Sequence, residues 1–354
     1  MNKPKIGGIL QIGIGVIDMP IARSWYHKNL NFSAQVLEEK NVTDLMTAYT
    51  GGVGHERQAA VIMNMAGAGG LEVWQYLSRE PKLPKQKPQL GDFGIFAIKL
   101  KTPDLGSARR ILELTNPTGR QESISGKKAF FFSDPFENHF QVVEGDEYFS
   151  KPKLTSGAYG AIIGCSDLEK SIHFYTEVLG FELKKTTAAE KVEAFEKLPG
   201  GNLTFKRAYL TKPKPEIGGF SNFLGNTEIE LIQSTDYQGI KMYEDRYWGD
   251  PGYIHICFDV RDMNELKAHC QKHSHPFVLD SFETEKGQSF NMGNVTSRVA
   301  YIDDPDGTAI EFVETHKVPL IPALGIAINL KGKNTVKNVP NWVLKLIGLN
   351  KLKE

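Results

Sequence analysis

The sequence predicts an α+β fold made of four modules, each with the element order βαβββ. Three observations lead to this prediction. The second half of the chain repeats the first, each half contains two stretches typical of a helix, and short apolar segments typical of strands flank every helix. A chain of 354 residues is long enough for two domains of ordinary size.

The first helix of each half gives the clearest repeat. Residues 16–32 (VIDMPIARSWYHKNLNF) align with residues 165–181 (CSDLEKSIHFYTEVLGF), 149 positions further along the chain. Each stretch contains an aspartate, which is a good N-cap because its carboxylate accepts hydrogen bonds from the free N–H groups of the first turn. Apolar residues follow at helical spacing, and Pro20 is tolerated because it lies in the first turn. Both stretches therefore predict a helix that begins after Asp18 or Asp167.

The last strands of each half also repeat. The matching pairs are GLEVWQ (70–75) with EIELIQ (228–233), and FFSDPFENHFQVVE (131–144) with YIDDPDGTAIEFVE (301–314). In the second pair, Asp-Pro followed by turn-forming residues joins two apolar strands. The two halves therefore run over about 8–145 and 157–315.

Each half divides once more at a break, over residues 79–92 and 234–250. A strand follows each break, then a helix over 104–114 or 262–272, then three further strands. This gives four modules, which we number one to four in chain order.

At the level of domains, the sequence predicts two similar units, residues 1–147 and 148–315, and an extension over 316–354. In the extension, the segment VPNWVLKLIGLNKL is amphipathic, with lysines opposite a mostly apolar side made of Trp342, Val343, Leu346, Ile347 and Leu349. We expect a helix that packs on the domains or on a second subunit. A helix lying on a membrane surface is the less favoured alternative.

Composition narrows the classes of function. Lys+Arg and Asp+Glu both number 42, so the balance of charge gives no sign of a nucleic-acid partner. The three cysteines form no CxxC pair, which favours a reducing compartment over a disulfide scaffold. No signal-like apolar region opens the chain, and no segment approaches the ~20 apolar residues of a membrane span. We therefore expect a soluble, cytoplasmic globular protein, and leave a homodimer open.

One histidine lies in an apolar strand pattern. In residues 249–260 (GDPGYIHICFDV), alternation places two sets of side chains on opposite faces: Ile254, Ile256, Phe258 and Val260 on one, His255, Cys257 and Asp259 on the other. The equivalent stretch of module two, residues 91–102 (GDFGIFAIKLKT), has Ala97 where module four has His255. The repeat therefore does not need His255 for its core. This histidine is a candidate ligand or base, with a hydrogen-bonded core residue as the alternative.

Two glutamates lie in apolar strands. Glu72 shares a strand face with Trp74 and Tyr76, and Glu311 lies in the strand TAIEFVE. A carboxylate in such a strand is costly to bury unless it is paired, hydrogen-bonded or bound to a metal ion. Each glutamate is therefore a candidate ligand, with a structural role as the alternative.

The first strand offers a further candidate. In LQIGIGV (10–16), alternation places Gln11, Gly13 and Gly15 on one face. The glycines leave room for another group to approach this face. Gln11 either binds that group or hydrogen-bonds to the backbone.

The strand–Asp–helix stretch ending in Leu-Gly-Phe, together with the DPDG–TAIEFVE ending, resembles the vicinal oxygen chelate superfamily. That superfamily includes glyoxalase I, extradiol dioxygenases and proteins of bleomycin or fosfomycin resistance. The resemblance covers about residues 8–315. It implies that the four modules form two glyoxalase-like barrels of curved sheet. It is less specific for the reaction, because this fold supports several chemistries.

The resemblance also implies which residues bind a metal ion. Glyoxalase-like sites take ligands from the first and last strands of two modules, and the matching residues are Gln11 and Glu72 in module one and His255 and Glu311 in module four. If these two modules share a barrel, the four residues form one complete site. It would hold one divalent metal ion (Zn, Ni, Co, Mn or Fe), with Glu311 or Glu72 as the catalytic base.

The other barrel would then contain Ala97, Gln141, Gly160 and Glu230, which form no plausible metal site. Glu230 is expected to be structural in that case. If neighbouring modules pair instead, neither barrel has a complete ligand set. The pairing of modules one and four is therefore the hypothesis that gives His255 its partners.

The reaction implied by the resemblance is a glyoxalase-like lyase or isomerase step on a small carbonyl or hydroxycarbonyl substrate, through a metal-held enediolate. An extradiol dioxygenase, which would need two histidines and one carboxylate, and a metal-free binding protein remain as alternatives. Glutathione-dependent glyoxalases carry arginines where this chain has Gly15 and Pro251, which argues against a glutathione adduct. Trp74 and Tyr76 predict an aromatic-walled cavity beside Glu72.

Overall fold

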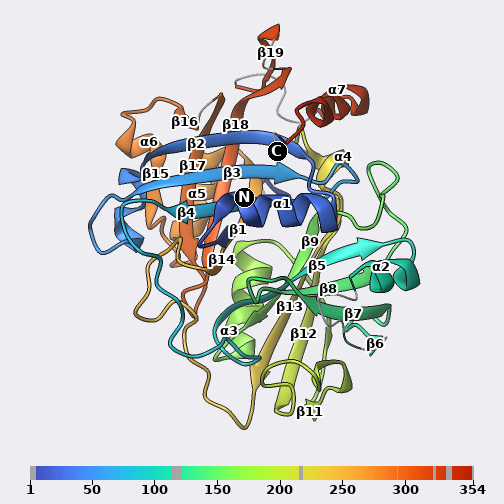
Figure 1. Cartoon of the computed structure of the whole chain (residues 1–354). Helices are drawn as coiled ribbons and strands as arrows, with labels where there is room; N and C mark the ends of the chain where they lie inside the picture. Colours follow the sequence, from blue (N-terminus) through green and yellow to red (C-terminus); the bar gives the residue numbers. More distant parts are fainter. Residues whose placement is uncertain are drawn as a thin grey trace.

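The computed structural model describes residues 5–112, 118, 121–214, 218–292, 294–321, 324–331 and 337–352. In these ranges the strands form two sheets, one of ten strands and one of nine. In Figure 1 the blue and orange strands make up one sheet and the green and yellow strands the other. The predicted α+β class with four βαβββ modules and two curved sheets is confirmed.

The ten-stranded sheet combines modules one and four, in the order β15-β17-β18-β14-β1-β4-β3-β2. Module one supplies β1 (Lys5–Gly15), β2 (Ala34–Val42), β3 (Glu56–Met63) and β4 (Gly70–Tyr76). Module four supplies β14 (Gly252–Arg261), β15 (Leu279–Asp280), β16 (Phe290–Met292), β17 (Val295–Asp303) and β18 (Ala309–Ile321). A further strand, β19 (Ile326–Asn329), pairs with β18. The pairing of modules one and four is therefore the one that the chain adopts.

The nine-stranded sheet combines modules two and three, in the order β10-β12-β13-β9-β5-β8-β7-β6. Module two supplies β5 (Gly94–Thr102), β6 (Gln121–Glu122), β7 (Lys128–Ser133) and β8 (His139–Glu144). Module three supplies β9 (Ala158–Gly164), β10 (Glu182–Thr186), β11 (Glu190–Lys191), β12 (Thr204–Lys212) and β13 (Thr227–Ser234). Each sheet thus draws strands from both halves of the sequence.

Every module has its helix after its first strand, and an aspartate caps each one. The main helices are α1 (Met19–Leu30), α2 (Leu105–Ile111), α3 (Leu168–His173), which continues into the π-helical turn η3 (Phe174–Val178), and α5 (Met263–Lys272). The side chains of Asp18, Asp104, Asp167 and Asp262 accept hydrogen bonds from backbone N–H groups of the first turn. The capping predictions at Asp18 and Asp167 are confirmed. Residues 113 and 114 of the second predicted helix lie outside the described ranges.

The main hydrophobic core is continuous between the two sheets, because one cluster of buried residues includes both β1 and β5 and all four helices. In each half of the chain, one buried tyrosine connects a helix to an Asp-Pro turn. The Tyr26 hydroxyl on α1 donates to Asp134 Oδ2 at 2.7 Å, and the Tyr175 hydroxyl on η3 donates to Asp304 Oδ2 at 3.3 Å. Asp134 and Asp304 belong to the Asp-Pro turns of modules two and four. The helices therefore hold sequence neighbours together while the strands pair across the chain.

The C-terminal extension packs on the ten-stranded sheet. It contains the short helix α7 (Asn341–Lys345) and the turn η6 (Leu346–Leu349). The buried residues are Leu344 and Ile347, whereas Trp342 is 69% exposed and Leu349 59% exposed. The expectation of a helix packed on the domains is met, but the apolar side expected at Trp342 and Leu349 is wrong, because the helix is too short to bury both ends. Residues 322, 323, 332–336, 353 and 354 of the extension lie outside the described ranges.

Other short elements connect the strands: η1 (Asp44–Tyr49), η4 (Glu193–Phe195), α4 (Ser221–Leu224) and α6 (Ser281–Thr284). The three cysteines are buried and free. Among the described residues, no helix is both long enough and apolar enough to pass through a membrane.

Candidate metal centre

Four adjacent strands of the ten-stranded sheet bring the predicted ligands together. In the order β18-β14-β1-β4, Gly13 on β1 lies opposite His255 on one side and Glu72 on the other. One row further along, Cys257 lies opposite both Gln11 and Glu311. The four candidate side chains lie on the face of the sheet that is turned away from the main core. Residues next to them in sequence point to the opposite face and belong to the main core.

The polar atoms of the four residues meet at one point. His255 Nε2 lies 3.3 Å from Glu72 Oε2 and 3.0 Å from Glu311 Oε2. The Gln11 amide nitrogen donates to the same two oxygens, at 3.2 Å and 3.4 Å. All four side chains are buried, and His255 is 0% exposed. Residues more than two hundred positions apart in sequence therefore form a single buried polar cluster.

The charges of this cluster do not balance. Burial lowers the pKa of His255, but the neighbouring carboxylates of Glu311 and Glu72 outweigh burial and raise it to about 9. For Glu311, burial acts to raise the pKa, but His255 and hydrogen bonds from Cys257 and Tyr301 lower it overall. One protonated imidazole thus faces two carboxylates. The cluster keeps a net negative charge that a bound cation would neutralise.

The donor atoms fit a divalent metal ion. One ligand atom each from Glu72, His255 and Glu311 lie within 4.8 Å of one another. Metal–nitrogen and metal–oxygen bonds of about 2.0–2.2 Å place neighbouring donors roughly 3.0–3.5 Å apart, in the range of the His255–carboxylate distances. Neither ring nitrogen of His255 makes a hydrogen bond of good geometry, and Nε2 would bind a metal ion after losing its proton. Gln11 would join the set after a half-turn of its amide, which exchanges the nitrogen for the oxygen.

The glycines of β1 make the space for this cluster. A Cβ atom at Gly13 would lie 2.4 Å from Cε1 of His255, and one at Gly15 would lie 2.1 Å from the backbone oxygen of Asp250. The expectation that these glycines leave room for another group is confirmed. The groups that approach are the His255 ring and the backbone that precedes β14.

Aromatic rings close one side of the cluster. Trp248 stacks on His255 with ring centroids 5.5 Å apart, and Tyr301 meets the same imidazole edge-on at 5.7 Å. Trp74 contacts Trp248 at 4.4 Å, and the Tyr76 hydroxyl donates to the Trp248 carbonyl. Trp74 and Tyr76 therefore pack tightly against the loop before β14. Trp74 and Tyr76 also contact each other, with ring centroids 6.4 Å apart, so the two rings are packed and do not form the walls of the expected cavity.

Sequence reasoning missed Trp248 and Tyr301. Tyr301 could have been found, because the Asp-Pro turn fixes the register of β17 and β18 and places Tyr301 opposite Glu311. Trp248 lies in the break between modules three and four, where no periodic pattern predicts contacts. Ile254 also departs from the expected alternation, since it packs with this aromatic cluster and not with the main core.

An apolar cavity of about 70 Å³ lies on the other side of Gln11. Its walls are mostly aliphatic and come from strands, from α4 and from the C-terminal extension: Leu10, Val36, Leu37, Val61, Met63, Phe220, Phe223, Leu224, Met292, Val295, Val313, Thr315, Val318 and Ile347. Gln11 is the candidate ligand that lines it. The candidate centre therefore has an aromatic side that is packed and an aliphatic side that is hollow.

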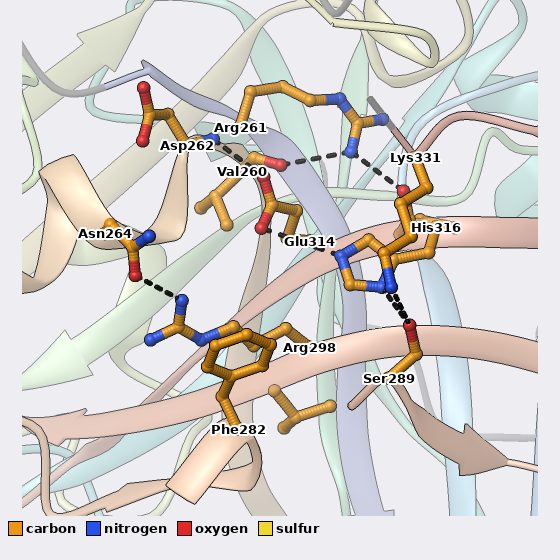
Figure 2. Close-up of polar contacts among 12 residues, drawn as sticks. Val260, Arg261, Asp262, Asn264, Phe282, Ser289, Arg298, Glu314, His316 and Lys331 are labelled. Atoms are coloured by element: carbon orange, nitrogen blue, oxygen red, sulfur yellow. Dashed lines mark hydrogen bonds and ion pairs between the residues drawn. The ribbon is translucent and has the colours of Figure 1, made fainter. Parts of the chain in front are cut away.

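A separate polar network lies at the far end of β14 and β18 (Figure 2). Glu314 accepts a hydrogen bond from the Asp262 N–H at 2.8 Å, and Ser289 Oγ lies 2.8 Å from His316 Nδ1. The distance from His316 Nε2 to Glu314 is 3.7 Å, which is too long for a hydrogen bond. These contacts join the end of β14 to β18, and β18 to the segment before β16.

In the nine-stranded sheet, the buried glutamates pair with a lysine and an arginine of the chain itself. Lys99, at 0% exposure, places its ammonium 2.8 Å from Glu228 and 2.9 Å from Glu230. Arg207 also donates two hydrogen bonds to Glu230. Burial acts to raise the pKa of Glu230, but Arg207 and Lys99 outweigh it and lower the pKa. With Ala97 and Gly160 at the other ligand positions, the described residues of this sheet give Glu230 structural partners and no metal-binding set.

Comparisons with known proteins agree with this architecture. Residues 159–312 match the family model described as Glyoxalase/Bleomycin resistance protein/Dioxygenase superfamily. A lactoylglutathione lyase of Neisseria meningitidis is 26% identical over 148 residues, which are 42% of this chain and 83% of that protein. The resemblance drawn from the sequence to glyoxalase, bleomycin-resistance and dioxygenase proteins is confirmed for the part of the chain that the family model matches, and the solved glyoxalase I structures share the fold.

Two solved structures share the fold over most of the chain. Glyoxalase I from Zea mays has a TM-score of 0.52 at 16% identity, over 87% of this chain and 92% of that one. A Bacillus subtilis protein assigned provisionally as a dioxygenase has a TM-score of 0.58 at 14% identity, over 88% of this chain and 86% of that one. At these identities the likeness concerns the fold and leaves the reaction to the site.

We expect the substitution Gly13→Ala to disrupt the cluster. The added methyl group would overlap the His255 ring, and forcing this buried ring to move should lower the free energy of unfolding by about 1–3 kcal/mol. Urea unfolding measures the change. Gly145→Ala is the control, because the atoms nearest to its new methyl group belong to the flexible Lys101 side chain at 3.2 Å. A Gly13→Ala protein as stable as wild type would contradict the close packing of β1 on His255.

We also expect Lys99→Met to be strongly destabilising. The substitution removes the cation that pairs with Glu228. It should lower the free energy of unfolding, measured in urea, by about 3–5 kcal/mol. The double variant Lys99→Met/Glu228→Gln should recover a large part of this loss, since Arg207 still neutralises Glu230. Lys170→Met, which removes an exposed ion pair to Asp167, should stay within about 0.5 kcal/mol of wild type. Equal effects of Lys99→Met and Lys170→Met would refute the structural role of Lys99.

Proposed function

We propose that this protein is a metal-dependent enzyme of the glyoxalase kind, a lyase or isomerase that acts on a small carbonyl or hydroxycarbonyl substrate. The observation that carries the proposal is the convergence of Gln11, Glu72, His255 and Glu311 on one buried point. They are the four residues that the superfamily pattern selects as ligands. One divalent ion (Zn, Ni, Co, Mn or Fe) would be held there.

The bound ion would polarise the oxygen atoms of the substrate and lower the cost of removing a proton from the neighbouring carbon. A carboxylate of the site takes that proton and returns it to the adjacent carbon, so that the substrate is isomerised without change in its atoms. Glu311 is held by His255, Gln11, Cys257 and Tyr301, whereas the contacts of Glu72 in the cluster are to His255 and Gln11. Glu72 is therefore the better placed base, with Glu311 as the second candidate.

Other residues of the site fix its geometry. Trp248 and Tyr301 hold the imidazole plane of His255 from two directions. Burial of the four side chains excludes bulk water, which strengthens the electrostatic interactions within the site. The chain keeps Gly15 and Pro251 where glutathione-dependent glyoxalases carry arginines, so the proposed substrate is not a glutathione adduct.

The alternative of an extradiol dioxygenase has less support. The buried cluster offers one histidine and two glutamates, whereas the Fe(II) site of such enzymes takes two histidines and one carboxylate. We retain the expectations of a small-molecule substrate and a cytoplasmic protein as part of the proposal, and a homodimer remains open.

Elemental analysis of the purified protein tests the metal site. Wild type should hold about one divalent ion per chain, while Glu72→Ala and Glu311→Gln should lose it, because each removes a charged ligand from a site of few ligands. Glu314→Gln is the matched control on the same strand as Glu311. Its carboxylate binds the Asp262 N–H and is not part of the cluster (Figure 2), so it should retain the metal.

Two results would contradict the proposal. Wild-type protein that takes up no metal even from a Zn²⁺, Ni²⁺, Co²⁺, Mn²⁺ or Fe²⁺ solution would favour the metal-free binding protein. Metal retained in full by both Glu72→Ala and Glu311→Gln would place the ion elsewhere.

A further inference from the structure

We propose that the substrate of this centre carries a neutral apolar tail of about five carbon atoms, and that the C-terminal extension forms part of the pocket that receives it. The inference rests on the proposed function and specifies its substrate class. It is carried by the position, covering, charge and size of the cavity beside Gln11.

The cavity and the candidate centre lie on the same face of the ten-stranded sheet. Val61, which lines the cavity, is the direct cross-strand neighbour of Glu72. Val313, another lining residue, lies two positions beyond Glu311 on β18 and so points to the same side. Gln11 belongs to both the centre and the lining. A molecule bound to the centre by its polar end therefore has the cavity as the adjoining hollow space.

One wall of the cavity comes from two segments that are additional to the βαβββ pattern, α4 between β12 and β13 of module three and the C-terminal extension. The first contributes Phe223 and Leu224. The second contributes Val318 on the end of β18 and Ile347 on η6. Ile347 and the α4 residues belong to the same buried apolar cluster. In Figure 1 the extension and α4 lie side by side at one end of this sheet.

The lining restricts the chemistry of the tail. It contains no charged side chain, and its polar members are Gln11 and Thr315. A carboxylate or ammonium group placed there would lose its hydration without gaining a partner, at a cost of several kcal/mol. The peptide part of a glutathione adduct carries such charges, so this cavity does not suit it. A neutral hydrocarbon tail loses nothing on entering and gains by leaving water.

The size of the cavity sets the length of the tail. It offers about 70 Å³ to the centres of water molecules. One water molecule needs roughly 10–15 Å³ of such space, so the cavity holds on the order of five water-sized groups. A methylene group is similar in volume to a water molecule. A tail of about five carbons therefore fills the cavity, and a much longer one does not fit without moving the extension.

Alkyl hydroxamates of increasing length test the inference, because the hydroxamate group binds a metal ion through two oxygens while the chain probes the cavity. Zn²⁺-loaded wild-type protein is titrated with acetohydroxamate, hexanohydroxamate and decanohydroxamate by calorimetry. Full burial of each added methylene corresponds to about fourfold in affinity, from ~0.8 kcal/mol per CH₂. We expect hexanohydroxamate to bind at least tenfold more tightly than acetohydroxamate, and decanohydroxamate to bind no more tightly than hexanohydroxamate.

Two variants of η6 show whether the extension is part of the pocket. Ile347→Phe reduces the space at a lining position and should reduce the preference for hexanohydroxamate over acetohydroxamate to less than threefold. Leu349→Phe makes the same kind of change at a residue that is 59% exposed and should leave the preference as in wild type. Metal content is measured in both and should be unchanged. Equal preferences in Ile347→Phe and wild type would overturn the role of the extension.

The failure of this inference can be told apart from the failure of the metal site. Metal-loaded protein that binds all three hydroxamates equally well would overturn the tail pocket while the metal centre stands. If the protein binds no metal, wild-type crystals under xenon pressure still test the cavity, because xenon enters apolar cavities without a polar contact. Xenon between Val61, Val313 and Ile347 supports the tail pocket in that case, and an empty cavity under pressure overturns it.

Discussion

The pairing of β1 with β14 is the interaction on which the rest of the site depends. It is an antiparallel pairing between strands about 240 residues apart, and it places Gly13 opposite His255. A slip of one residue would place His255 and Gln11 on opposite faces of the sheet. The register is fixed on both faces, by the core residues between the sheets and by the fit of the imidazole over a glycine. Close packing and polar chemistry thus select the same register.

The two sheets differ in which groups compensate the charge of their buried carboxylates. In the nine-stranded sheet the chain supplies the compensating charge, since Lys99 and Arg207 surround Glu230 and Glu228. In the ten-stranded sheet the position equivalent to Lys99 is Cys257, which brings no charge. There a single histidine faces Glu72 and Glu311. The same fold therefore contains one set of carboxylates neutralised by a lysine and an arginine, and one set that a metal ion would neutralise in the proposed function.

Much of this arrangement could be predicted from the sequence, because its causes are local or repeated. Aspartate caps, strand alternation and the repeated turns predicted the four modules. The presence of Ala97 at the position equivalent to His255 indicated that the core does not require the histidine. The pairing of modules one and four followed from the ligand set that the superfamily resemblance implies. Trp248 could not be placed, since it lies in a break between modules that follows no periodic pattern, and the contact of Ile347 with α4 could not be predicted from the amphipathic pattern alone. Their positions depend on which spaces the paired strands leave to be filled.

The surroundings of the candidate centre are asymmetric, with a packed aromatic cluster on one side and an apolar cavity on the other. On the side of Trp248 the rings of Trp74 and Tyr301 are packed to ordinary contact distances, so movement there would break a dense buried cluster. On the side of Gln11 the hollow is covered by α4 and by short C-terminal elements, which contact the sheet through a few apolar side chains. Short, peripheral segments open at lower free energy than core strands. In the proposed function, α4 and the C-terminal extension would therefore move at lower cost than the aromatic side to admit a substrate.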